Sequence, residues 1–135
     1  MSVNDRIRLE VPASTSFFPV VRMVVGGAAA RADLRLDQLQ DLQMALEELL
    51  CAAQGLDEAS RYAVVTHVDA SFLTVSTGPF SSAELRALLA READHESFDL
   101  THLLVHMVHS LDVRDDGDGF WVAIGVRLGE GQTAN

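Results

Sequence analysis

A single amphipathic helix, expected over residues 36–54, constrains the fold of this chain more than any other segment. Its apolar side chains recur at steps of three and four residues: Leu39, Leu42, Leu46, Leu49 and Ala53. On a period of 3.6 residues these positions form one continuous stripe, which a soluble protein buries against other elements. Glu48 lies on a neighbouring line of the same helix, where a second layer or a ligand could meet its carboxylate.

The ends of this helix are predicted from local signals. Asp37 followed by Gln40 has the spacing of a capping box, so the helix is expected to begin there. Gly55 stands where a C-terminal cap belongs.

The segment before this helix predicts a strand and a shorter helix. Residues 6–11 alternate between apolar and charged side chains, as a half-buried strand does, and Pro12 ends the run. A serine or threonine at positions 14–16 can cap a helix that runs to about Arg31, with Pro19 in its first turn.

The segment after it predicts two hairpins separated by helices. Residues 62–68 and 71–76 are expected to pair as strands, the second ended by Gly78 and Pro79. Helices are expected over residues 83–93 and 100–110, and strands over 111–114 and 120–128 flank an Asp-Gly turn. Residues 1–128 then form one α+β domain, a two-layer sandwich with helices on one face of a sheet, and residues 129–135 a disordered tail.

Composition excludes some classes of function. The net charge of −10 and the absence of a basic patch argue against nucleic-acid binding, and an acidic surface suits a basic protein partner. The longest apolar run, residues 17–30, is interrupted by Arg22 and too short to cross a membrane. A single cysteine, Cys51, and the lack of a secretory signal favour a cytoplasmic protein.

The segment DLQMALEELLCAA resembles the N-box helix of the GHKL (Bergerat-fold) ATPases, in particular the small anti-sigma-factor serine kinases. The matching positions are Asp41, Leu42, Ala45, Glu48 and Ala53. The resemblance implies a Bergerat fold with helices on one face of a mixed sheet, and Glu48 as general base. It also implies ATP and magnesium as cofactors, a homodimer, and a sigma factor or its STAS-domain antagonist as partner. Ala52 replaces the magnesium-holding asparagine, and its methyl group offers no oxygen to the cation.

Two further nucleotide motifs of that family are altered. The Asp-x-Gly-x-Gly box corresponds to residues 76–80, where Gly78 remains, Ser76 replaces the acid and Phe80 replaces the second glycine. A shift of two residues places Thr74 at the acid position. No glycine lies between Gly78 and Gly117, so the phosphate-binding turn is missing as well. ATP binding is therefore expected to be weak or lost.

Three hypotheses of function follow. The first is an anti-sigma-factor-like regulator that acts by protein contacts, with Arg22 on the partner surface as the resemblance implies. The other interpretation is that Arg22 extends to solvent from the edge of a packed helix. The alternative is an active ATP-dependent serine/threonine kinase acting on a STAS-domain protein. The third is a metal-sensing or small-ligand module that uses His102, His106 and His109, although no bound metal is expected because a full ligand set is missing.

Overall fold

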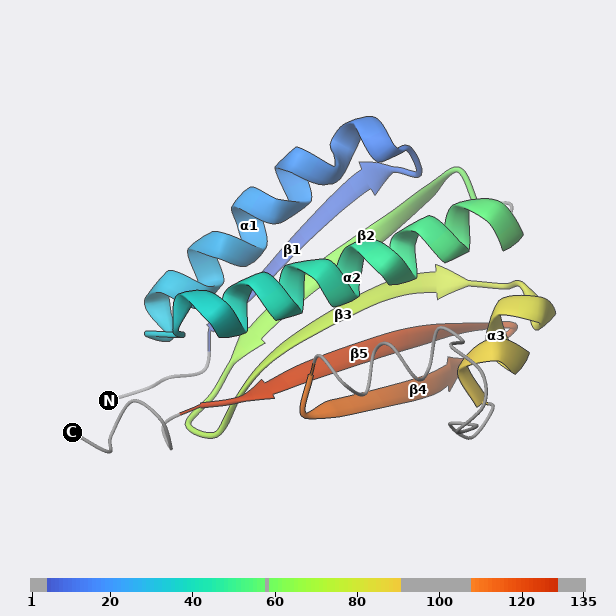
Figure 1. The fold of residues 1–135 in the computed structure, drawn as a ribbon. Helices are drawn as coiled ribbons and strands as arrows, with labels where there is room; N and C mark the ends of the chain where they lie inside the picture. The colour runs from blue at the N-terminus through green and yellow to red at the C-terminus, as the bar shows by residue number, and fades with distance from the viewer. Residues whose placement is uncertain (1–4, 58, 91–107, 129–135) are drawn as a thin grey trace, which may run out of the picture.

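The computed structural model describes residues 5–57, 59–90 and 108–128, which form one five-stranded sheet with α1 and α2 on one face (Figure 1). The elements in chain order are β1 (Asp5–Pro12), a 3₁₀ turn (Thr15–Phe17), α1 (Phe18–Arg31), α2 (Leu36–Leu56), β2 (Arg61–Val68), β3 (Phe72–Phe80), α3 (Ala83–Ala90), β4 (Ser110–Asp116) and β5 (Gly119–Arg127). The strand order is β1-β2-β3-β5-β4. The predicted α+β class is confirmed.

The sheet is antiparallel throughout, so the expectation of a mixed sheet was wrong. The reason lies in the connection between β1 and β2. Because α1 and α2 run in opposite directions across the sheet, the chain is back at the end of the sheet where β1 finished when β2 begins (Figure 1). A single crossover helix would have delivered β2 parallel to β1.

The core lies between the two long helices and the sheet, as the apolar stripe predicted. Leu42, Leu46, Leu49 and Ala53 are buried, and Leu39 packs at the margin. The fully buried side chains that face them come from α1 and from three strands: Val21, Val25, Val64, Leu73 and Ile124. This burial of apolar surface is the main force that holds the helices on the sheet.

The helix ends follow the predictions only in part. Ser14 caps the 3₁₀ turn by accepting a hydrogen bond from the Ser16 backbone N–H, and Pro19 lies in the first turn of α1, both as expected. The cap of α2 was misplaced. The Arg35 backbone N–H donates to the side-chain oxygen of Gln38 at 3.3 Å, so the box begins two residues before Asp37.

The other end of α2 also departs from the prediction. The helix continues through Gly55 to Leu56, and Asp57 is the C-cap. The Asp57 backbone N–H donates to the Ala53 carbonyl at 2.7 Å while Asp57 itself is extended. This ending needs no residue with positive φ, so the conformational freedom of glycine is not required.

Strand β3 is longer than predicted because Gly78 and Pro79 remain within it, up to Phe80. The pairing of β3 with β2 ends at Gly78, so the missing N–H of Pro79 costs no bond on that side. Beyond a register shift, β3 pairs only with β5, where Phe80 lies opposite Phe120.

The last hairpin is confirmed, with Asp116 paired to Gly119 and Gly117 in the turn at φ +63°. The prediction that a helix ends at Ser110 was wrong, since β4 begins there and residues 108–109 form a bend. The rest of that helix, residues 91–93 of the preceding one and the predicted tail lie outside the described residues. Within the described ranges, no helix has the length and apolar character to span a membrane.

Candidate functional site

Glu48 lies on the solvent-facing side of α2. Its side chain is exposed, whereas Leu46 and Leu49 on either side of it point into the core. Ala52, one turn further along, is partly buried and packs against the core. A carboxylate in this position is accessible to solvent and to a partner, but it stands on the outer part of the helix layer.

Ser76 lies on the other side of the molecule, and Gly78 lies two residues further along the same strand. Strand β3 alternates, so Leu73 and Val75 face the helices while Thr74 and Ser76 line a groove on the open face of the sheet. The full thickness of the sheet therefore separates them from Glu48. The structure does not bring together the residues that the resemblance assigns to the base and to the adenine-binding motif.

The space around the altered glycine box is filled by aromatic rings. Phe80 is 1% exposed, and its ring centroid lies 6.2 Å from that of Tyr62 and 5.7 Å from that of Phe120. A Cβ atom on Gly78 would come within 2.9 Å of the Trp121 indole. Glycine is needed at position 78 because the indole of the neighbouring strand lies across it.

The groove on the open sheet face has a volume of about 660 Å³ and carries charges of both signs. The Arg8 guanidinium lies 5.7 Å from the centre of the Trp121 ring and also pairs with Glu10. On the far side, Arg114 pairs with Asp112 at 3.1 Å. Among the charged side chains that line the groove, three arginines (Arg6, Arg8 and Arg114) stand against three carboxylates (Asp69, Asp115 and Asp116). This mixture of charges does not favour a polyphosphate.

Arg22 forms an ion pair that joins the two long helices. Its Nε donates to Oε2 of Glu47, and its second guanidinium nitrogen donates to Oε1 at 2.9 Å. The Gln43 amide donates to the Arg22 carbonyl at 3.2 Å. The hydrogen bond to Glu47 and its negative charge raise the pKa of Arg22 above its ordinary value. Because the guanidinium is bound yet half exposed, its face away from Glu47 remains accessible.

Four large apolar side chains of α1 and α2 are exposed to solvent. The exposed fractions are 75% for Met23 and 52% for Met44, which follow Arg22 and Gln43 directly in the sequence. Val20 on α1 and Leu36 on α2 are also exposed, at 40% and 69%. We refer to Val20, Met23, Leu36 and Met44, with the Arg22–Glu47 pair, as the helix-layer surface. Groups of exposed apolar side chains of this kind mark contact sites for other proteins.

The sequence contained a signal for this surface. Met44 falls off the buried stripe of the central helix, and Leu36 stands at its first turn before the stripe begins. An amphipathic helix normally presents polar residues at such positions, so the departures from the pattern indicate an interaction surface.

The histidine hypothesis is tested at one position only. His109 accepts a hydrogen bond at Nδ1 from the Arg127 backbone N–H at 2.9 Å, while His102 and His106 lie outside the described residues. In the part of the chain that the structure describes, no three metal-binding side chains lie together.

Comparison of the sequence with models of known protein families and with curated proteins found no match.

Proposed function

We propose that the protein is an anti-sigma-factor-like regulator that binds its partner through the helix-layer surface and does not use ATP. The exposure of Met23, Leu36 and Met44 on the two long helices, which the Arg22–Glu47 pair joins, carries this proposal. Water contact with such side chains is unfavourable, and a protein partner that covers them gains the corresponding free energy. Methionine is suited to this role because its flexible side chain adapts to a partner surface.

The arrangement of the nucleotide candidates supports a function without ATP. Glu48 lies on the solvent-facing side of α2, while Ser76 lines the groove on the opposite face of the sheet. A base and an adenine-binding group must both reach one nucleotide, which these positions do not allow. Phe80 occupies the place of the second glycine and fills the core there.

The class of partner comes from the resemblance of α2 to the N-box helix. We propose a Bergerat-type ancestry for the domain, with a sigma factor or a STAS-domain antagonist as the bound protein. The charge of −10 would steer a basic partner surface towards it. A homodimer, which the resemblance also implies, would use a separate surface, for example the free edge of β1.

Binding assays with the sigma factors and STAS-domain proteins of the source genome test the proposal. We expect one of them to bind the wild-type chain, and the double variant Met23→Asp, Met44→Asp to bind it at least roughly tenfold more weakly. Both side chains are more than half exposed, so the variant should keep its thermal stability. The variant Ala87→Asp on the exposed side of α3 is the matched control and should bind normally.

Two results would contradict the proposal. One is that none of these proteins binds the wild-type chain. The other is that the double variant binds as tightly as the wild type, which would place the contact elsewhere.

A further inference from the structure

The side of α1 that points away from the sheet carries a row of exposed residues without charge. Its members, Val20, Met23, Gly27 and Ala30, follow one another at steps of three and four residues and so share one side of the helix. A helix that faces only water normally presents polar residues there, because water contact with apolar side chains is unfavourable. We refer to these four residues as the outer row of α1.

Gly27 lies in the middle of this row, although the fold itself does not require a glycine there. A Cβ atom on Gly27 would meet nothing within 4 Å beyond the adjoining turns of its own helix. Its backbone is helical and does not have the positive φ that favours glycine. Glycine inside a helix is destabilising relative to alanine. What glycine offers at this position is space, because any side chain would hold an approaching backbone away from α1.

The outward side of α2 carries carboxylates. Asp41, Met44 and Glu48 also follow one another at steps of three and four residues, and all three are exposed. Neither Asp41 nor Glu48 has an ion-pair partner among the described residues. The arginines of this layer are already paired with other carboxylates: Arg22 with Glu47, Arg31 with Asp5 and Arg35 with Asp37. The charge beside Met44 is therefore negative and not balanced within the described chain.

The two helices lie side by side and antiparallel, so one partner element can reach both (Figure 1). Arg22 and Gln43 join them along a seam, and Gly26 faces Gln43 there without a side chain of its own. Packed helices have axes about 8–10 Å apart. A third helix laid along this seam would therefore reach the outer row of α1 on one flank and the carboxylates of α2 on the other.

We propose that the partner segment bound by the helix-layer surface is a basic amphipathic helix. Its apolar stripe covers Met23, Gly27 and Met44, and lysine or arginine side chains beside the stripe pair with Asp41 and Glu48. This inference rests on the proposed function and adds the chemistry of the segment that is bound. Exposed ion pairs contribute little free energy, so the apolar contacts hold the helix and the charges select it.

Titration of the full chain with a synthetic peptide, followed by ¹H–¹⁵N NMR, tests the proposal. The peptide is alanine-based and about 21 residues long, so that it can form a helix, with leucines at steps of three and four residues and lysines along one flank. We expect saturable shifts of the Met23, Gly27 and Met44 amide signals with a Kd below about 100 μM. A second peptide with glutamate in place of every lysine keeps the apolar stripe and should bind at least roughly tenfold more weakly.

Substitution of Gly27 tests the close approach. Gly27→Leu should weaken binding of the lysine peptide at least roughly tenfold, whereas Ala87→Leu on the exposed side of α3 should leave it unchanged. The space at Gly27 is empty and leucine favours a helix more than glycine does, so Gly27→Leu should not lower Tm. Gly27→Ala should raise Tm by about 2–4 °C, as expected if no contact within the chain needs the glycine.

Removal of the two carboxylates tests the charge pairing. Asp41→Asn combined with Glu48→Gln should weaken binding of the lysine peptide about fivefold. Glu84→Gln combined with Asp118→Asn removes the same charge from two exposed positions elsewhere and should have no effect.

Three results would overturn the inference: no shift at the Met23, Gly27 and Met44 amides with ~1 mM lysine peptide, equal binding of the two peptides, or normal binding to Gly27→Leu. The proposed function is judged separately, by the sigma factors and STAS-domain proteins. If one of them binds through Met23 and Met44 while the lysine peptide does not bind, only the basic helix is wrong. If the peptide binds as expected and none of those proteins does, only the class of partner is wrong.

Discussion

Replacing Phe80 by alanine is expected to lower the free energy of unfolding by about 3–5 kcal/mol. The side chain is 1% exposed, and its ring joins Tyr62 of β2 to Phe120 of β5 at the end of the sheet. Its loss removes buried apolar surface and leaves a cavity that the surrounding strands cannot close. Urea denaturation followed by circular dichroism measures the change.

Two matched variants show whether this loss is due to packing. Phe80→Leu keeps most of the volume and should cost less than half as much as the alanine variant. Phe72→Ala removes the same ring from the same strand at a partly exposed position, where the ring contacts Arg127, and should also cost less. A loss below about 1 kcal/mol for Phe80→Ala would mean that the ring is loosely held. The space at the glycine box would then be open to a ligand, contrary to our account.

Asp57→Ala is the second change with a large expected effect, a loss of about 2–3 kcal/mol. Three backbone N–H groups, those of Ala59, Ser81 and Ser82, lose the carboxylate that accepts from them. Because these groups belong to two separate turns, the substitution should loosen the start of α3 relative to the end of α2. Urea denaturation measures the stability, and hydrogen exchange at Ser81 and Ser82 locates the change.

The controls for Asp57 separate charge from hydrogen bonding. Asp57→Asn keeps one acceptor oxygen and should recover part of the loss. Asp116→Ala removes an exposed carboxylate from β4 and should change the stability by less than about 0.5 kcal/mol. Unchanged exchange at Ser81 and Ser82 in Asp57→Ala would show that the carboxylate does not hold the two turns together.

Periodicity predicted the helices of this fold better than their ends. The stripe through Leu42, Leu46 and Leu49 located α2 and its buried face, because side-chain spacing alone determines which side of a helix is apolar. The cap depends on which backbone N–H groups remain unpaired. Arg35 and Gln38 satisfied that need where Asp37 and Gln40 were expected to.

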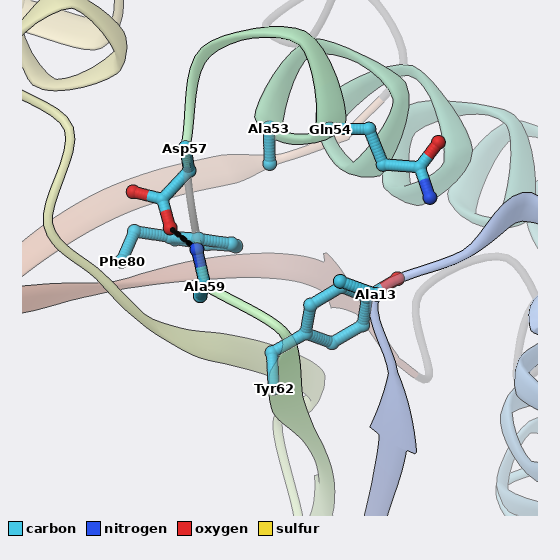
Figure 2. Close-up of a pocket in the computed structure, with 7 residues that line it drawn as sticks. All are labelled: Ala13, Ala53, Gln54, Asp57, Ala59, Tyr62 and Phe80. Atoms are coloured by element: carbon cyan, nitrogen blue, oxygen red, sulfur yellow. Dashed lines mark hydrogen bonds between the residues drawn. The ribbon is translucent and has the colours of Figure 1, made fainter.

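The sequence could not predict on which face of the sheet the candidate residues lie, because this depends on the topology. The alternation of Leu73 and Val75 shows that Ser76 points away from them, but only the packed helices show that Ser76 then lies opposite Glu48. A small pocket lined by Ala13, Ala53, Tyr62 and Phe80 could not be predicted for a similar reason (Figure 2). Its walls come from three segments far apart in the sequence.

The expectation of a mixed sheet failed because only one helix matched the resembled family at the level of a motif. The residues of α2 match a motif, whereas strand direction depends on the whole path between strands. Two helices between β1 and β2 return the chain antiparallel, and no residue within α2 determines this.

The central claim is that the protein is a regulator that acts through protein contacts and does not use ATP. Isothermal titration calorimetry with ATP and magnesium tests this claim most directly. We expect no saturable heat up to about 1 mM nucleotide, because Glu48 and Ser76 lie on opposite sides of the sheet. Micromolar binding that disappears in Glu48→Ala would contradict the claim and support the serine/threonine kinase instead.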